Sequence, residues 1–246
     1  MAVTTAVILA AGMGTRLKEF GKLAPKGFLQ LGNIPIVEES IIKLLACNIQ
    51  RIIIITGHLS EFYQQLQKRY PQKIFTVHNP EYAQSGSMYS LHCAHHWLDD
   101  DFLLLESDLI YEKRALEIVL NFPKDNVILL SEPTNAGDEV YVETNGTTIV
   151  AMSKNLSQLS QAPSGELVGI SLISQALFQQ MLQYAKNSFH STLKIDYETD
   201  ALVRVAQIYP VYYTVASNLL WTEIDDEYHL SRAKNQIYPA ILRQDR

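Results

Sequence analysis

The sequence predicts an α/β fold, doubly wound around a mostly parallel, Rossmann-like mixed sheet. Short apolar runs such as residues 52–55 and 102–105 are typical of buried strands. Segments with apolar residues at helical spacing, such as residues 34–46, alternate with these runs, and this alternation favours a mostly parallel sheet. The third observation is Asn145-Gly146 between alternating residues, which predicts a β-hairpin with a type I′ turn.

The whole chain, residues 1–246, is expected to form one domain with the hairpin inserted at about residues 137–155. Either this hairpin is a lid over a second substrate or it is a surface hairpin with no role at the site. Ligands of such sheets bind beyond the carboxyl ends of the strands, where the first strand (residues 7–9) ends. Further strands are expected at residues 51–56, 73–77, 102–108, 126–131, 165–173 and 209–215, and helices at 34–46, 61–70, 87–97, 111–120, 174–185, 196–207 and 228–242.

Composition limits the classes of function. Hydrophobic residues make up 47% of the chain and charged residues 19%, which supports a sizeable core and argues against disorder. The net charge of −6 disfavours nucleic acid as a partner but leaves room for a small nucleotide bound by a local basic loop. Cys47 and Cys93 have neither metal-site nor redox spacing, which indicates free thiols in a reducing compartment. We expect a cytoplasmic protein without membrane insertion.

The loop after the first strand is the strongest candidate site. Small residues at Ala10 and Ala11 precede Gly12 and Gly14, which can adopt positive φ at low cost, and the backbone N–H groups of such a loop can hold phosphate oxygens. Arg16 and, after Pro25, Lys26 add positive charge. The spacing is not that of a P-loop, and Leu17 replaces the third glycine of a dinucleotide-binding fingerprint.

Two further segments have both a structural and a functional interpretation. Ser85-Gly86-Ser87 lies at an expected helix start, where it either receives a base or ribose edge or caps the helix. Asp108 follows Glu106 at the end of an apolar strand, where it either binds Mg²⁺ or caps the next helix. The acids of residues 196–200 suit the first turn of a helix because of the helix dipole.

Taken together, several blocks resemble one family over nearly the whole chain. They are G-M-G-T-R, P-K-G-F, G-S-M-Y-S-L, L-L-L-E-S-D-L-I-Y, G-D-E-V-Y, S-K-N, G-E-L-V-G-I, D-Y-E-T-D and W-T-E-I-D-D. The chain is similar to the phosphocholine-type cytidylyltransferases of the nucleotidyltransferase superfamily, and most of all to the bacterial 2-aminoethylphosphonate cytidylyltransferases. The resemblance implies transfer of CMP from CTP to 2-aminoethylphosphonate with release of pyrophosphate, and Mg²⁺ as cofactor.

The resemblance also implies roles for single residues. Asp108 and Asp225 would hold Mg²⁺, and Lys26 and Arg16 would act on the phosphates, so these four are the expected catalytic residues. Nucleotide-binding residues would be Leu9, Ala10, Ala11, Gly12, Gly14, Thr15, Arg16, Lys26, Ser85, Gly86, Ser87 and Glu106. For the acceptor, the candidates are Asp138 and Glu139 at its ammonium, Tyr141 and Trp221 as walls, and Lys154 at its phosphonate.

Three alternatives stay open. The acceptor could be phosphocholine or phosphoethanolamine; a quaternary ammonium favours an aromatic cage, whereas a primary ammonium favours carboxylates such as Asp138 and Glu139. A non-catalytic nucleotide sensor would retain the loop but lack the metal ligands. A nicotinamide oxidoreductase would need the missing third glycine. The partners expected are CTP and a small zwitterionic phosphonate or phosphate, with no nucleic acid, and the sequence leaves a homodimer open.

Overall fold

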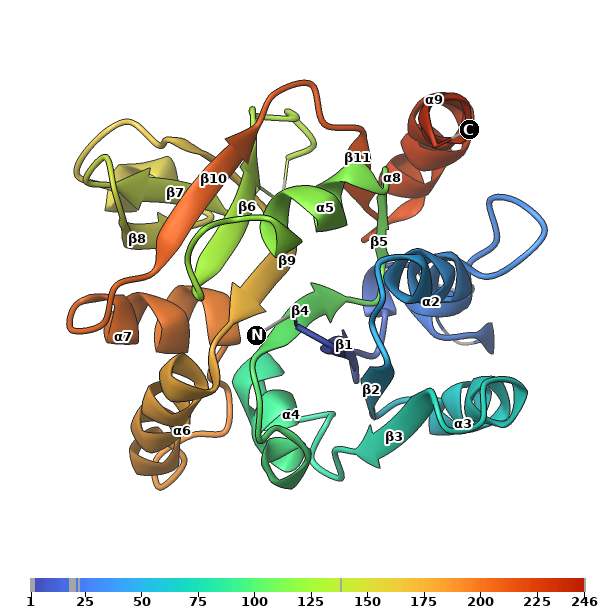
Figure 1. The fold of residues 1–246 in the computed structure, drawn as a ribbon, viewed down its shortest axis with the longest axis horizontal. Coiled ribbons are helices and arrows are strands. Elements are labelled where there is room, and N and C mark those ends of the chain that lie inside the picture. Colours follow the sequence, from blue (N-terminus) through green and yellow to red (C-terminus); the bar gives the residue numbers. More distant parts are fainter. Residues whose placement is uncertain (1–2, 18–20, 22, 138, 246) are drawn as a thin grey trace.

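The computed structural model describes residues 3–17, 21, 23–137 and 139–245, and within them nine strands form one mixed sheet (Figure 1). These strands are β1 (Thr5–Ala10), β2 (Arg51–Thr56), β3 (Ile74–His78), β4 (Phe102–Glu106), β6 (Val127–Ser131), β7 (Tyr141–Thr144), β8 (Ile149–Ser153), β9 (Gly165–Ile173) and β10 (Tyr212–Ala216). The sheet runs in the order β10-β6-β9-β4-β1-β2-β3, with β9 antiparallel to both of its neighbours. The predicted α/β class with a mostly parallel sheet is confirmed.

The predicted helices are also present, with shifted ends. They are α2 (Ile36–Ala46), α3 (Ser60–Arg69), α4 (Ser87–Cys93), α5 (Arg114–Leu120), α6 (Gln175–Ser188), α7 (Val203–Ala206), α8 (Glu227–Arg232) and α9 (Tyr238–Gln244). The helices expected at residues 196–207 and 228–242 each contain a π-helical stretch, Tyr197–Leu202 before α7 and Ala233–Ile237 between α8 and α9. Within the described part of the chain, no helix has the length and apolar character needed to cross a membrane.

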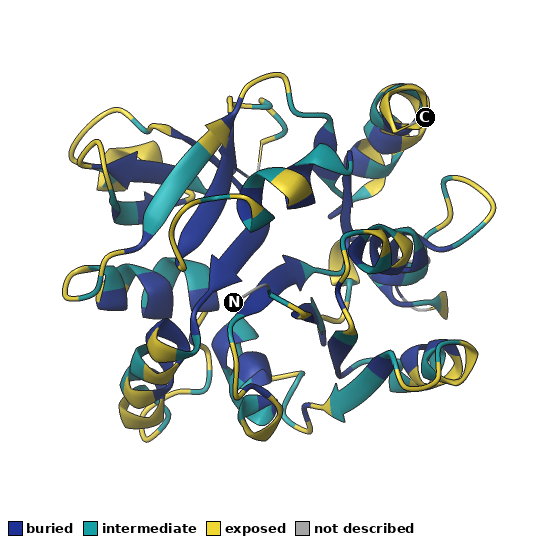
Figure 2. Ribbon diagram, in the orientation of Figure 1, coloured by how far each residue is buried: buried dark blue, intermediate teal, exposed yellow. Residues whose placement is uncertain are grey.

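Successive strand residues point to opposite faces of the sheet and so build two cores. On one face, Val7 and Ile53 pack in a cluster with residues of α4 and α6. On the other face, Ile8 and Ile52 pack with residues of α2, α3 and α5. The central strands are therefore buried on both sides, as Figure 2 shows in dark blue, which explains why their sequences are continuously apolar.

The register of the sheet brings distant segments together at one edge. β1 is parallel to both β2 and β4, and Leu9 near the end of β1 pairs with Glu106 at the end of β4. After β4 the chain turns at Ser107 and Asp108 into β5 (Leu109–Tyr111), which pairs with β11 (Trp221–Glu223) in a separate two-stranded sheet. The Ile224 N–H donates to the Asp108 carbonyl oxygen at 3.0 Å. The loop after β1, the turn after β4 and the segment after β11 are thus neighbours.

The predicted hairpin is β7 and β8, but it is not a free-standing insertion. β7 pairs with β9 as well as with β8, so the hairpin extends the central sheet. The expected type I′ turn is wrong: Gly146 has a φ of 90°, but Asn145 does not have the positive φ that this turn requires. Instead, Asn145 Oδ1 accepts hydrogen bonds from the backbone N–H groups of Thr147 (3.1 Å) and Thr148 (2.9 Å) and stabilises a longer loop.

Candidate active site

A cleft of about 390 Å³ opens at the carboxyl ends of β1 and β4. The sequence-predicted residues that line it come from five segments far apart in the chain, and so the structure does bring them together. They are Leu9, Ala10, Ala11, Gly12, Gly14, Thr15, Arg16, Lys26, Ser85, Gly86, Ser87, Glu106, Asp108, Lys154 and Asp225.

The glycine loop forms one wall of this cleft. Gly14 has a φ of +62°, in the left-handed region, and its carbonyl accepts a hydrogen bond from the N–H of Leu17 at 3.1 Å. Gly12 does not need positive φ, but a Cβ built on it would meet no atom within 4 Å. The backbone at Gly12 therefore faces open space, which leaves room for the close approach of a ligand.

Lys26 lies between the two aspartates that the sequence predicts as metal ligands. Its Nζ donates to Asp108 Oδ2 at 2.8 Å and also to Asp225 Oδ1, while Arg16 Nη2 contacts Asp225 Oδ2 at 2.5 Å. The Lys26 side chain is 16% exposed and that of Asp225 only 1%. Burial alone would lower the pKa of Lys26, but the carboxylates of Asp108 and Asp225 outweigh burial and raise it. The lysine is a charged group held in place by these carboxylates.

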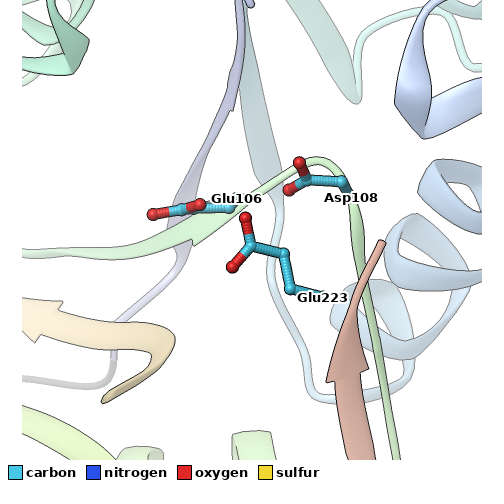
Figure 3. Close-up of side chains that lie close together, drawn as sticks. All are labelled: Glu106, Asp108 and Glu223. Carbon is cyan, nitrogen blue, oxygen red and sulfur yellow. The ribbon is translucent and has the colours of Figure 1, made fainter. Parts of the chain in front are cut away.

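Asp108 also belongs to a cluster of carboxylates with Glu106 and Glu223. One oxygen of each residue lies within 4.8 Å of an oxygen of the others, and the three side chains point toward one another from β4, the following turn and β11 (Figure 3). Burial, and then the charges of neighbouring carboxylates, raise the pKa of both Glu106 and Glu223. Clustered carboxylate oxygens are the donor set that Mg²⁺ prefers, so these residues fit a divalent cation.

Sequence reasoning missed two acids of the cleft wall, Asp196 and Glu198. Ser87 holds this segment: its Oγ lies 3.3 Å from Asp196 Oδ1 and from Glu198 Oε2, and it accepts the N–H of Tyr197 at 2.8 Å. Burial, and then the charge of Asp196, raise the pKa of Glu198 to about 7. The helix-dipole interpretation of these acids is therefore incomplete, and the D-Y-E-T-D block was the signal that could have revealed them.

Neither of the two ambiguous segments supplies a side-chain cap to the helix that follows it. Gly86 is the N-cap of α4 and makes no side-chain cap, and its N–H donates to the Leu193 carbonyl oxygen at 2.9 Å. A Cβ on Gly86 would lie 2.3 Å from the carbonyl oxygen of Ile195, so glycine allows this close backbone contact. Lys113, and not Asp108, is the N-cap residue of α5. Both segments instead face the cleft.

The predicted acceptor residues are divided between two cavities. Lys154, directly after β8, lines the main cleft, whereas Glu139 and Trp221 line a smaller neighbouring cavity. Tyr141 lines neither cavity, but its hydroxyl donates to Glu139 Oε2 at 3.4 Å. Asp138 lies outside the described residues. Glu223 lines both cavities and so forms their shared wall.

The smaller cavity has a distinct electrostatic character. Its charged lining residues within the described ranges are all acidic: Glu139, Glu166 and Glu223. Burial alone would raise the pKa of Glu139, but backbone N–H groups, that of Gly137 among them, lower it. Trp221 is 4% exposed, and its Nε1 has no hydrogen-bond partner within the described part of the chain. The cavity can attract a small cation.

Comparison with known proteins identifies similar sequences. Residues 6–193 match the family model of the MobA-like NTP transferase domain. The chain is 27% identical over 238 residues to a CMP-5′-(3-aminopropyl)phosphonate synthase of Streptomyces rubellomurinus. It is 32% identical over 108 residues to a 2-aminoethylphosphonate cytidylyltransferase of Lancefieldella rimae. It is 31% identical over 155 residues to a choline-phosphate cytidylyltransferase of Haemophilus influenzae. These matches cover 90%, 44% and 63% of this chain, but only 37%, 44% and 65% of the relatives' lengths.

Solved structures of low sequence identity share the fold. The structure of an inositol-1-phosphate CTP transferase from T. maritima superposes with a TM-score of 0.83 at 20% identity, over 99% of this chain and 96% of the other. A CTP:phosphocholine cytidylyltransferase from Streptococcus pneumoniae superposes with a TM-score of 0.74 at 19% identity, over 95% and 98% of the two chains. At these identities the likeness concerns the fold alone.

Proposed function

Because the chain belongs to the family of MobA-like NTP transferase domains, we propose that it is a cytidylyltransferase that transfers CMP from CTP to 2-aminoethylphosphonate and releases pyrophosphate. One observation carries this proposal: a glycine loop, two basic side chains and carboxylates from separate segments line a single cleft at the carboxyl edge of the sheet. Relatives named for CMP-aminopropylphosphonate synthesis and for aminoethylphosphonate cytidylyl transfer support the choice of nucleotide and acceptor.

The nucleotide is proposed to bind along the loop from Leu9 to Arg16. The open space at Gly12 and the left-handed conformation of Gly14 leave the loop backbone available to the β- and γ-phosphates. Arg16 is more than half exposed and can turn from Asp225 toward the triphosphate. The Ser85–Ser87 segment, across the cleft at the start of α4, is proposed to receive the base or the ribose.

The reaction we propose needs no general base. A phosphonate oxygen, already anionic at neutral pH, attacks the α-phosphorus of CTP in line and forms the new P–O bond. The bond from the α-phosphorus to the bridging β-phosphate oxygen breaks, and its electron pair leaves with pyrophosphate. Lys26 stabilises the charge that develops on the α-phosphoryl oxygens, and Arg16 holds the leaving pyrophosphate.

Asp108 and Asp225 would hold Mg²⁺, with the carboxylates of Glu106 and Glu223 beside Asp108. The fit lies in the donor set: burial, and then the charges of neighbouring carboxylates, raise the pKa of Glu106 and Glu223, and a divalent cation would relieve this repulsion. Mg²⁺, when bound, neutralises charge on the triphosphate oxygens. Lys26 now links the two aspartates, so it must give up at least part of this contact to reach the phosphates.

The acceptor is proposed to span the two cavities. Lys154 in the main cleft would contact the phosphonate, and the ammonium would enter the acidic cavity near Glu139, where Trp221 forms an apolar wall and Tyr141 orients the Glu139 carboxylate. Asp138 stays a candidate from the sequence. A primary ammonium can donate hydrogen bonds to such carboxylates, whereas the quaternary ammonium of phosphocholine has no N–H to donate. The electrostatics therefore favour the primary amine.

A pyrophosphate-release screen tests the proposal. Four NTPs are each paired with 2-aminoethylphosphonate, phosphocholine, phosphoethanolamine and glucose-1-phosphate in the presence of Mg²⁺. We expect the highest kcat/KM with CTP and 2-aminoethylphosphonate, and no turnover by the Asp108→Asn variant. A higher kcat/KM with phosphocholine would replace the acceptor but keep the chemistry. Tight CTP binding without turnover of any pair would favour a nucleotide sensor.

A further inference from the structure

His229, in the first turn of α8, contacts one lining residue of each of the two cavities. It is 4% exposed. Its Nδ1 lies 3.4 Å from the backbone nitrogen of Asp225, which lines the main cleft, and its Nε2 lies 3.2 Å from the carbonyl oxygen of Ala136, which lines the smaller cavity. The imidazole thus links a proposed metal ligand, Asp225, to Ala136 in the wall of the smaller cavity.

The two contacts need one acceptor and one donor on the ring. The backbone N–H of Asp225 can only donate, so Nδ1 is the acceptor of this contact. The carbonyl oxygen of Ala136 can only accept, so Nε2 carries the proton and donates. The two nitrogens of one rigid ring supply both, and Asp226 Oδ1 holds the first turn of α8 by accepting the backbone N–H of His229 at 2.8 Å.

We propose that His229 is a positioning residue that sets the distance between Asp225 and Ala136, next to the Gly137 N–H that binds the Glu139 carboxylate, and thereby aligns the metal site with the acceptor's ammonium subsite. His229 itself lines neither cavity. The Asp225 backbone also follows the short strand β11, and Ile224 is tied to Asp108, so a shift at residue 229 would reach the carboxylate pair directly. The part that concerns the acceptor rests on the proposed function, whereas the part that concerns the metal ligand does not.

Two variants of His229 separate hydrogen bonding from packing. His229→Phe keeps a planar ring but removes both polar atoms, and His229→Gln keeps one acceptor and one donor on a flexible chain. His92→Phe on α4, which removes a half-buried imidazole away from both cavities, is the matched control. Mn²⁺ affinity is measured by electron paramagnetic resonance without substrates, and KM for CTP and for the acceptor by pyrophosphate release.

For His229→Phe we expect about a tenfold weaker Mn²⁺ affinity, as for loss of a partner that orients a metal ligand. The acceptor KM should rise by a similar factor, and the CTP KM should change less than about twofold, because the hydrogen bonds from His229 to Asp225 and Ala136 do not involve the glycine loop. His229→Gln should restore both values to within about threefold of wild type, and His92→Phe should match wild type throughout.

The inference is overturned if His229→Phe folds and keeps wild-type Mn²⁺ affinity and acceptor KM, or if His229→Gln is as impaired as the Phe variant. If His229→Phe does not fold, His229→Asn replaces it, because its amide is one methylene shorter and cannot reach both partners. Equal behaviour of the Asn and Gln variants would then refute the link between Asp225 and Ala136. A wild-type protein that binds Mn²⁺ but turns over no substrate would refute the proposed function and leave the metal arm of this test intact.

Discussion

Replacing Lys26 with methionine tests both the chemistry and the resting arrangement of the cleft. The substitution keeps an unbranched side chain as far as Cε but removes the ammonium that contacts Asp108 at 2.8 Å and also pairs with Asp225. Loss of one preorganised charge contact in a transition state costs about 10²–10³ in kcat, or roughly 3–4 kcal/mol. We expect a fall in kcat of this size, with a smaller change in the CTP KM.

The same variant should also be less stable without metal. Removing one partner of a buried ion pair costs about 3–5 kcal/mol, because the remaining charge is left uncompensated. Here two carboxylates lose their lysine, and a divalent cation could replace it. We therefore expect Mg²⁺ to raise the Tm of Lys26→Met by more than it raises that of wild type, which thermal unfolding with and without Mg²⁺ would measure.

Lys43→Met is the matched control. Lys43 pairs with Asp245 at 3.0 Å, and its side chain is 16% exposed, as is that of Lys26, but it lies outside the main cleft. It should lose some stability and keep its kcat. A Lys26→Met kcat within about threefold of wild type would refute the electrostatic role. Equal effects of Mg²⁺ on the Tm of wild type and Lys26→Met would refute the idea that Lys26 stands where a cation is needed.

Three more predictions follow from the same geometry. Asp108→Asn and Asp225→Asn should each abolish Mg²⁺-dependent turnover without unfolding the chain, and near-normal kcat at saturating Mg²⁺ would remove that residue from the metal site. Gly12→Ala should keep the stability of wild type, because its Cβ would meet no atom within 4 Å, yet it should raise the CTP KM. By contrast, Gly86→Ala should destabilise the fold by about 1–3 kcal/mol, because its Cβ would lie 2.3 Å from a backbone oxygen. Urea unfolding measures the stability of each glycine variant, and CTP titrations measure its CTP KM. A normal CTP KM for Gly12→Ala would contradict the proposed path of the phosphates. Burial raises the pKa of Glu198 from 4.5 to about 7. Between these pH values the folded state still binds a proton that the unfolded chain has released, so the free energy of unfolding should fall as pH rises from about 4.5 through 7. Thermal unfolding between pH 5 and 8.5 should show a smaller fall for Glu198→Gln, and an unchanged slope would contradict the assignment.

Local sequence was enough to predict the parts of the cleft that lie at strand ends. Residues that directly follow a buried strand must emerge at the carboxyl edge of a parallel sheet, and so the positions of Gly12 and Asp108 could be predicted from the sequence. Asp225 follows a strand of only three residues, and the W-T-E-I-D-D block was needed to assign it. Strand periodicity thus predicts one edge of the sheet, but it does not predict which charges meet there.

The features that the sequence did not predict mostly depend on contacts between distant segments. Glu198 enters the cleft because the backbone of Gly86 packs against Ile195 and because Ser87 holds the following turn, and neither contact has a periodic signature in the sequence. Glu139 lies in the smaller cavity because β7 pairs with β9, which continues the central sheet. The conformation of Asn145 depends on its own side-chain hydrogen bonds, which compete with the type I′ turn that Asn-Gly otherwise favours.

The position of the label after one reaction tests nucleotidyl transfer most directly. The protein would be incubated with 2-aminoethylphosphonate, Mg²⁺ and CTP that carries ³²P either at the α- or at the γ-phosphorus, and the products would be separated by charge. We expect the α-label to move into a CMP–aminoethylphosphonate conjugate and the γ-label to leave in pyrophosphate in equal amount. Recovery of the γ-label on the acceptor or as inorganic phosphate, or of the α-label in free CDP, would contradict it.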